Sequence, residues 1–369
     1  MDLSKFTKSE HITKAIKLAK LGKLDYQPFI FSNDLEVGAG FGFCEGEFQG
    51  RIAYPDSLMN DKKNSEKLHV PVDIKDKKIF SAANNGVRNL YEYYINEICE
   101  IFGTNYNNLS MADVGCNSGY FPISFAKKGF KTTVGFDRED YSDTIQLFNN
   151  ILNTNAEFVH NKYDGNFFWK VSRQFDLTIS IAVLCHLSDP LQHLAYLGKM
   201  SKEAIFISTP VRPDDYEYSI HFGEPNKYYG SDEFPFCFDN LVRPSRRLLK
   251  KSLNLMGFTN IYELPMPEIK TVPFEIYYAS CNILAVKTNS PFEKKLNERA
   301  KMNPINGNPY KEMFEKYNAT IYGNHNIFNY GNEFIGVPDG TRYKFDKKLD
   351  PKILKSTTMD SLIEAIDKS

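Results

Sequence analysis

The sequence lacks several features that would assign it to a broad class of protein. Among its 369 residues there is no apolar run near the roughly 18 residues that span a bilayer, and Met1 to Lys5 lack the apolar character of a secretion signal. The six cysteines are scattered without a CxxC pair, so the sequence indicates neither a zinc site nor a disulfide framework. These absences predict a cytoplasmic protein with reduced thiols and no membrane partner.

An excess of charge of one sign is also missing. The chain has 45 Lys and Arg against 46 Asp and Glu, a net charge of −1. No global basic field would therefore draw it onto nucleic acid, although a local basic patch keeps an RNA partner open as an alternative. The basic run at 243–251 is interpreted as a solvated helix face, with phosphate binding as the alternative. The sequence leaves a homo-oligomer open.

Short apolar runs alternate with helical patterns between residues 82 and 288. The predicted strands are 111–114, 132–136, 157–159, 175–182, 203–208, 259–264 and 277–287. The predicted helices are 85–102, 120–128, 141–152, 190–200 and 245–256. Strands and helices that take turns through short connections predict an α/β domain, with a mostly parallel seven-stranded sheet and helices on both faces.

The two ends of the chain do not share this alternation. Residues 1–81 are predicted to form an N-terminal extension with a helix at 11–21 and short strands within 26–54. Residues 289–369 are predicted to form a small C-terminal α+β module, with a helix at 291–300 and β-structure at 322–343. Its last helix, 356–366, has Ser356 or Thr357 as the expected N-cap.

A glycine-rich loop lies directly between the first predicted strand and the helix that follows it. The loop reads Asp113-Val-Gly115-Cys-Asn117-Ser-Gly119, with Tyr120 opening the helix. Glycines there let backbone N–H groups approach a ligand at a helix N-terminus. A carboxylate that opens the loop would repel a phosphate. It suits a ligand with a cationic amino group, such as S-adenosylmethionine.

A second acid closes the next predicted strand. Asp137 follows strand 132–136, where a carboxylate can accept hydrogen bonds from both ribose hydroxyls of a nucleoside. The order strand, acid-opened glycine loop, helix, strand, acid is more specific than a glycine loop alone. The alternative interpretation is a tight strand–helix turn with a capping acid.

These motifs resemble those of the class I S-adenosylmethionine-dependent methyltransferases, over about residues 81–287. The loop 113–119 matches the family's first motif, with Asn117 in place of the middle glycine, and Asp137 matches its ribose-binding acid. Ala182-Val-Leu-Cys-His186-Leu-Ser-Asp189-Pro190 is similar to a motif of methyltransferases related to those that modify the tRNA wobble uridine. Gly257-Phe258 resembles a late element of the family.

The resemblance implies a Rossmann-like fold and S-adenosylmethionine as cofactor. The residues expected to bind this cofactor lie at the strand ends of the domain. They are Asp113, Gly115, Asn117, Gly119, Tyr120, Asp137, Arg138, Tyr163, Asp164 and Ile181. No metal site is predicted.

His186 is the candidate catalytic residue. It follows strand 175–182, at the edge where open α/β sheets bind their ligands, and a neutral imidazole there could accept a proton from a methyl acceptor. The alternative is that His186 caps the following helix or braces the Asp189-Pro190 turn. His193, further along, is interpreted as structural.

Five residues are candidates for contact with the methyl acceptor. Arg88 and Tyr91 share one face of helix 85–102, where a helix–domain salt bridge is the alternative for Arg88. His221, Tyr228 and Tyr229 lie in the long segment 209–242, a connection of the length that usually forms a lid or a specificity insert.

The sequence thus predicts a methyltransferase that acts on oxygen or nitrogen of a small molecule or saccharide. A tRNA wobble-uridine methyltransferase is the first alternative. A protein that binds the cofactor without turnover and serves in assembly is the second.

Overall fold

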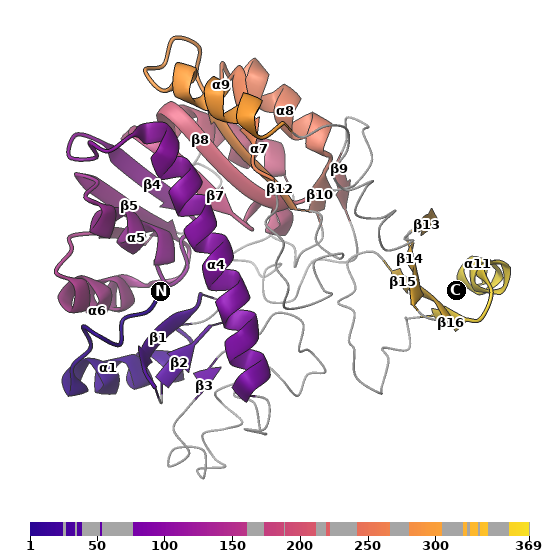
Figure 1. Ribbon diagram of the computed structural model, residues 1–369, viewed down its shortest axis with the longest axis horizontal. Coiled ribbons are helices and arrows are strands. Elements are labelled where there is room, and N and C mark those ends of the chain that lie inside the picture. The colour runs from indigo at the N-terminus through magenta and orange to yellow at the C-terminus, as the bar shows by residue number, and fades with distance from the viewer. Residues whose placement is uncertain are drawn as a thin grey trace.

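The computed structural model shows an α/β domain with additional structure at both ends of the chain (Figure 1). The described residues are 1–24, 27–33, 35–38, 52–53, 77–160, 173–187, 189–211, 219–221, 242–265, 280–304, 320–322, 325–330, 333–338 and 354–368. Among the described helices, none combines the length and apolar character that crossing a membrane requires.

A seven-stranded sheet forms the centre of the domain, as the alternation of the sequence predicts. Its strands are β4 (Ser110–Val114), β5 (Thr132–Asp137), β6 (Glu157–His160), β7 (Phe175–Ile181), β8 (Ser201–Pro210), β11 (Asn260–Glu263) and β12 (Ser280–Val286). Their order is β11-β12-β8-β7-β4-β5-β6, and β12 is antiparallel to both of its neighbours. The other strand pairs are parallel. The prediction of a mostly parallel, Rossmann-like seven-stranded sheet is confirmed.

The strand order reverses at β4, which makes this strand the topological switch point of the sheet. From β4 the chain builds outward through β5 to β6, and then returns to the other side of β4 with β7 and β8. Side chains at the carboxyl ends of β4 and β7 therefore border the switch point, where open α/β sheets bind ligands.

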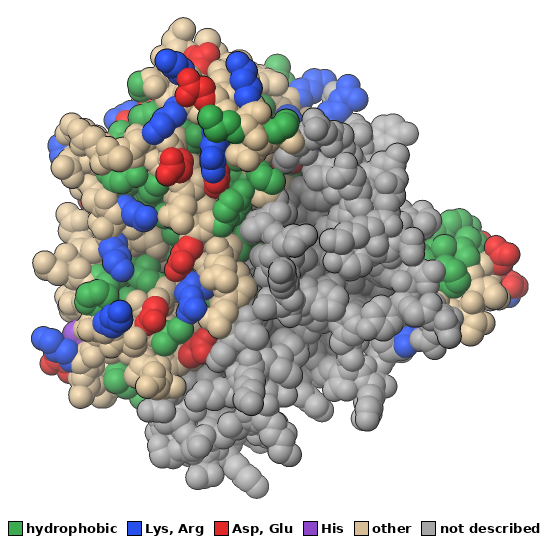
Figure 2. Space-filling model, viewed as in Figure 1, with side chains coloured by type: hydrophobic (Ala, Val, Ile, Leu, Met, Phe, Trp, Pro, Cys, Tyr) green, Lys and Arg blue, Asp and Glu red, His purple; other side chains and the backbone are tan. Residues whose placement is uncertain are grey.

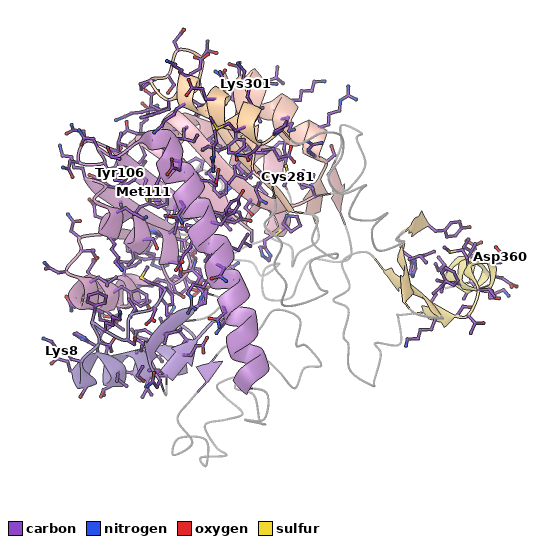
Figure 3. The ribbon with its side chains drawn as sticks, in the orientation of Figure 1. Lys8, Tyr106, Met111, Cys281, Lys301 and Asp360 are labelled. Atoms are coloured by element: carbon purple, nitrogen blue, oxygen red, sulfur yellow. The ribbon has the colours of Figure 1, made fainter. Side chains whose placement is uncertain are left out.

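Helices cover both faces of the sheet. They are α4 (Lys77–Phe102), α5 (Tyr120–Lys128), α6 (Ser142–Leu152), α7 (Pro190–Met200), α8 (Arg246–Leu255) and α9 (Glu293–Met302), with the short helix η3 (Leu184–His186) after β7. Side chains of a strand alternate between the two faces: on β8, Phe206 joins the cluster under α4, α5 and α6, whereas Ile207 joins the cluster under α7 and α8. Met111 and Cys281, labelled in Figure 3, belong to these two clusters respectively.

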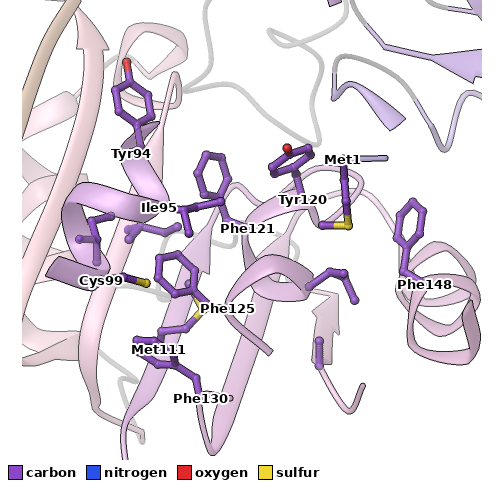
Figure 4. Close-up of a cluster of buried hydrophobic side chains, with 14 of the residues drawn as sticks. Met1, Tyr94, Ile95, Cys99, Met111, Tyr120, Phe121, Phe125, Phe130 and Phe148 are labelled. Atoms are coloured by element: carbon purple, nitrogen blue, oxygen red, sulfur yellow. The ribbon is translucent and has the colours of Figure 1, made fainter. Parts of the chain in front are cut away.

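Helices α4 and α5 contribute several of the aromatic residues in the first cluster. Figure 4 shows Tyr94 and Ile95 of α4 beside Phe121 and Phe125 of α5, all of them buried. Burying such side chains contributes about 1.5–3 kcal/mol each by removing apolar surface from water. The abundance of phenylalanine and tyrosine is therefore accounted for, in this region, by core packing.

The N-terminal segment joins the same cluster. It contains α1 (Ser9–Lys20), β1 (Phe29–Ser32), β2 (Leu35–Val37) and β3 (Ile52–Ala53), which confirms a helix followed by short strands. The Phe29 ring stacks on Phe148 of α6 at 4.3 Å between ring centroids. Helix α4 begins earlier than predicted and runs across position 81, so the division at 81/82 stays a proposal.

The C-terminal segment contains a small sheet with one helix against it. Its strands are β13 (Thr320–Tyr322), β14 (His325–Tyr330), β15 (Glu333–Pro338) and β16 (Leu354–Ser356), and its helix is α11 (Met359–Asp367). Ile327 of β14 is buried with Leu362 and Ile366 of α11, so the predicted α+β character is present. The N-cap of α11 is Thr358, not Ser356 or Thr357 as predicted, because the Thr358 hydroxyl accepts from Ser361 N. The boundary at 288/289 remains a proposal.

Candidate cofactor site

The glycine-rich loop lies at the carboxyl end of β4 and is tied to β5. Gly115 N and Cys116 N both donate to the Phe136 carbonyl, at 2.8 and 3.0 Å. Gly115, with φ +86°, accommodates the Val183 side chain: a Cβ on Gly115 would lie 2.2 Å from Val183 Cγ2. The loop therefore needs glycine at 115 both for its backbone angle and for space.

Asn117 takes the place of a glycine at the middle of the loop. Its φ is +49°, in the left-handed region that asparagine tolerates better than most residues. Its backbone N–H donates to Asp137 Oδ2 at 2.8 Å, and its side chain donates to the Tyr141 hydroxyl at 3.2 Å. The asparagine thus preserves the turn and connects the glycine loop to the second acid.

A buried carboxylate, Asp113, and a half-buried one, Asp137, lie at the carboxyl ends of the neighbouring strands β4 and β5. Asp113 is 2% exposed, and no donor in the described part of the chain hydrogen-bonds to its carboxylate. Burial, together with the neighbouring charge of Asp137, raises the pKa of Asp113 well above its usual value. Burial also raises the pKa of Asp137, although the N–H groups of Glu139 and Asn117 oppose this by donating to it.

This pair of acids fits a cationic nucleoside. Burial removes water from these carboxylates, and the charge of Asp137 repels that of Asp113; a bound cation relieves this free-energy cost, whereas a phosphate would increase it. Asp113 has acceptor capacity that no described donor uses, and Asp137 ends the strand beside it. These two residues could hold an ammonium group and a pair of ribose hydroxyls, as S-adenosylmethionine provides.

Tyr91 of α4 lies close enough to Asp113 to feel its charge, and it packs against Tyr120, the first residue of α5. Their rings meet edge to face at 5.1 Å between centroids. Burial and the charge of Asp113 raise the pKa of Tyr91, so its hydroxyl stays protonated as a donor. Arg88, one turn earlier on α4, donates to Asn85 Oδ1 at 2.5 Å. Contact of Arg88 and Tyr91 with a substrate stays a prediction.

The end of β7 completes this edge of the sheet. Ile181 ends the strand, and the next residue, Ala182, has φ +56°, an unusual value for an alanine. The turn leads into η3, where His186 N donates to the Val183 carbonyl at 2.9 Å and the His186 side chain is half-buried. His186 therefore lies at the carboxyl edge of the sheet, as predicted, and its role stays a prediction.

His193 lies on α7 and contacts Ser180 of β7, and its structural role stays a prediction. It is fully buried, and burial lowers its pKa to about 3. Ser180 Oγ donates to the Val114 carbonyl and lies 3.1 Å from His193 Nε2, so we assign the donor role in that contact to the histidine.

Several predicted site residues lie outside the described residues. They are Tyr163, Asp164, Tyr228 and Tyr229. For His221 only the backbone is described: it lies in β9 (Ser219–His221) and pairs with Val242 of β10 (Val242–Pro244). Arg138, which follows Asp137, is half-buried, and its carbonyl lies 2.8 Å from His160 Nε2 at the end of β6.

Three residues at the site were not predicted from the sequence. Gln27 contacts the glycine loop from the N-terminal segment, Tyr141 contacts Asn117, and His160 contacts Arg138. His160 could have been found, because it ends the strand next to β5. Within the described residues, no group of three or more His, Cys, Asp or Glu side chains could hold a metal.

A family model described as "Methyltransferase domain" matches residues 87–263. This range begins in α4, contains the loop, Asp137 and His186, and ends with β11. The family match agrees with the strand order of the sheet, with the glycine-rich loop 113–119 and with Asp137 at the end of β5. Residues 87–263 are a class I methyltransferase domain. S-adenosylmethionine, the methyl donor of this class, is its cofactor.

Curated relatives and solved structures resemble parts of the chain. A mitochondrial ubiquinone biosynthesis O-methyltransferase of Dictyostelium discoideum is 29% identical over 112 residues, which are 27% of this chain and 35% of that protein. A tRNA U34 carboxymethyltransferase of Helicobacter pylori (strain G27) is 26% identical over 182 residues, 45% of this chain and 61% of that one. The chain thus spans between about a third and three fifths of the length of these relatives.

Two solved structures are similar to part of the chain at low sequence identity. Magnesium protoporphyrin IX methyltransferase of Synechocystis PCC 6803, with bound S-adenosylmethionine, is 15% identical with a TM-score of 0.37, covering 59% of this chain and 85% of that one. The N-terminal domain of EvdMO1, with bound S-adenosylhomocysteine, is 14% identical with a TM-score of 0.38, covering 53% and 79%.

Proposed function

We propose that this chain transfers the methyl group of S-adenosylmethionine to an oxygen or nitrogen of a small molecule or saccharide. The observation that carries the proposal is the pair of acids at the carboxyl ends of β4 and β5, where Asp113 is buried and Asp137 is half-buried. Within the described residues, Asp113 has no hydrogen-bond donor, so a cationic ligand would relieve the cost of its burial.

The residues of the chain have separate tasks in this proposal. When bound, the cofactor would supply an activated methyl group, because the sulfonium sulfur leaves as the neutral thioether of S-adenosylhomocysteine. Asp113 and Asp137 hold the cofactor, and the glycine loop lets the backbone approach it. Positioning of the two reactants then accounts for most of the rate enhancement.

His186 is proposed as the general base. It lies at the carboxyl edge of the sheet on η3, where it could take a proton from an attacking hydroxyl or amine. His186→Ala should therefore abolish transfer while it leaves cofactor affinity unchanged. Unchanged transfer in this variant would remove the base assignment.

A labelled-methyl assay tests the function. The purified chain with methyl-labelled S-adenosylmethionine is mixed with a metabolite extract or, separately, with bulk tRNA, and each mixture is then analysed by mass spectrometry. We expect a metabolite that gains one methyl group and no labelled tRNA. Labelled tRNA would instead support the wobble-uridine alternative, which the similarity to the Helicobacter pylori enzyme favours. Cofactor binding with no acceptor in either fraction would favour the non-catalytic assembly role.

A further inference from the structure

A side chain of the N-terminal segment hydrogen-bonds to the backbone of the glycine loop and of the helix that follows it. Gln27 is 6% exposed, and its Nε2 donates to the Cys116 carbonyl at 3.0 Å. Its Oε1 accepts from Tyr120 N at 2.8 Å. One amide thus connects the middle of the loop to the first residue of α5 from a position about 90 residues earlier in the chain.

The two contacts require both halves of an amide. Tyr120 is the first residue of α5, where a backbone N–H has no carbonyl partner within its own helix. The Cys116 carbonyl also accepts from Gly119 N at 3.0 Å, which closes a turn over residues 116–119. The Gln27 amide adds a second donor to the same carbonyl. A glutamine supplies the acceptor for the first group and the donor for the second, whereas a carboxylate supplies only acceptors.

The loop has a conformation that needs such support. Its residues Gly115, Asn117 and Gly119 all have positive φ, at +86°, +49° and +89°. The left-handed conformation costs about 1–2 kcal/mol at a residue other than glycine, so Asn117 in particular must be held by its surroundings. Asn117 N in turn donates to Asp137, so the loop conformation also affects one of the two acids.

We propose that Gln27 is a positioning residue for the cofactor, although it lies outside the matched range 87–263. By connecting Cys116 to Tyr120, it holds the loop and the Asn117 N–H in the geometry that cofactor binding uses. The N-terminal segment is then part of the cofactor site. This inference rests on the proposed function.

The same segment offers a matched control. Thr144 of α6 is fully buried, and its hydroxyl donates to the Lys23 carbonyl at 3.1 Å. Thr144→Val removes a hydrogen bond between the N-terminal segment and the domain, but it leaves the glycine loop intact. If Gln27 only docked the segment, the two changes would have the same effect.

Isothermal titration calorimetry with S-adenosylhomocysteine tests the proposal on the full chain, with thermal unfolding of each variant alongside. We expect Gln27→Met to raise the dissociation constant about tenfold, because two hydrogen bonds to the loop are lost. Gln27→Glu, which keeps only the bond to Tyr120 N, should also weaken binding. The dissociation constant of Thr144→Val should stay within about twofold of that of the unchanged chain. We expect this even if the melting temperature of Thr144→Val falls as far as that of Gln27→Met.

The outcomes separate this proposal from the proposed function. If the unchanged chain binds and both Gln27 variants bind as Thr144→Val does, Gln27 has only a docking role and the proposal is overturned. Should Gln27→Met fail to fold, Gln27→Glu decides by the same comparison. An unchanged chain that fails to bind S-adenosylhomocysteine contradicts the proposed function itself, and the role of Gln27 falls with it.

Discussion

At the scale of single residues, the acids that we propose to bind the cofactor lower the stability of the free protein. Asp113 is buried beside Asp137 and receives no hydrogen bond from any described residue, which is an unfavourable arrangement for the free protein. Asp176, at the other end of the sheet, shows the contrast. It accepts from Ser110 N and Ser110 Oγ, both at 2.7 Å, and these bonds join β4 to β7.

Removal of the Asp113 charge should therefore stabilise the free protein and weaken binding. The pKa of Asp113 is raised in the folded state, so its contribution to stability is present at low pH and is lost as the pH rises through that pKa. At pH 7.5 we expect Asp113→Asn to raise the melting temperature by a few degrees and to weaken S-adenosylmethionine binding at least tenfold.

Asp176→Asn is the control for this prediction. It removes a carboxylate that is well hydrogen-bonded and remote from the switch point, so it should lower the melting temperature and leave binding unchanged. A loss of stability in Asp113→Asn together with normal affinity would contradict our interpretation of the buried acids.

Some of the site residues could be predicted and others could not, for physical reasons. Asp113 and Asp137 follow apolar strands, so their place at one edge of a parallel sheet follows from local patterns. The contact of Gln27 with Cys116 joins residues 89 apart, and nothing in the sequence around Gln27 indicates it. Tyr141 presents the same difficulty, because its contact with Asn117 depends on how α6 docks.

At the scale of elements, a buried chain of hydrogen bonds fastens α7 to the sheet. His193 of α7 contacts Ser180 of β7, and Ser180 donates to the Val114 carbonyl of β4 at 3.1 Å. Val114 directly precedes Gly115, so the chain ends beneath the glycine loop. The sequence predicted a structural role for His193 but not these partners, which come from two strands that are adjacent only in the fold.

This arrangement predicts a specific loss of stability in acid. The His193 pKa is lowered to about 3 in the folded state, whereas an unfolded histidine titrates near 6.5. Between these values the unfolded chain binds the extra proton, so stability falls as the pH is lowered. From pH 7 to pH 5 this one group should lower the free energy of unfolding by about 2 kcal/mol.

Urea denaturation of His193→Gln at the two pH values measures the effect. Between pH 7 and pH 5, the free energy of unfolding of the variant should fall by about 2 kcal/mol less than that of the unchanged chain. Ser180→Ala, which keeps the buried histidine, should be less stable at both values yet retain the pH dependence. Equal pH dependence in His193→Gln and the unchanged chain would show that the histidine is not the responsible group.

At the scale of the whole molecule, the N-terminal segment and the sheet domain share one hydrophobic cluster. The periodicity of the sequence predicted the strands and the helices of the domain, because each buries one face. It could not predict how the flanking segments dock, since that depends on contacts between distant residues. One example is the buried Glu97 of α4, which accepts from Tyr262 and forms a salt bridge with Arg299 of α9.

The surface agrees with the balanced composition. On the face drawn in Figure 2, basic and acidic side chains are interspersed over the described part of the chain. The basic residues of α8 include Arg246 and Lys250, and both form ion pairs with Glu263 at 2.6 Å. These two side chains are therefore engaged within the protein, which supports the small-molecule proposal over tRNA.

The central claim is that this domain binds S-adenosylmethionine through the acids at the switch point. Calorimetry of the full chain with S-adenosylhomocysteine tests it most directly, with Asp137→Ala and the exposed neighbour Glu139→Ala compared under the same conditions. We predict saturable one-to-one binding that Asp137→Ala weakens by about 10- to 100-fold and Glu139→Ala leaves unchanged. Binding of equal strength in Asp137→Ala and the unchanged chain, or no binding by the unchanged chain, would contradict the account.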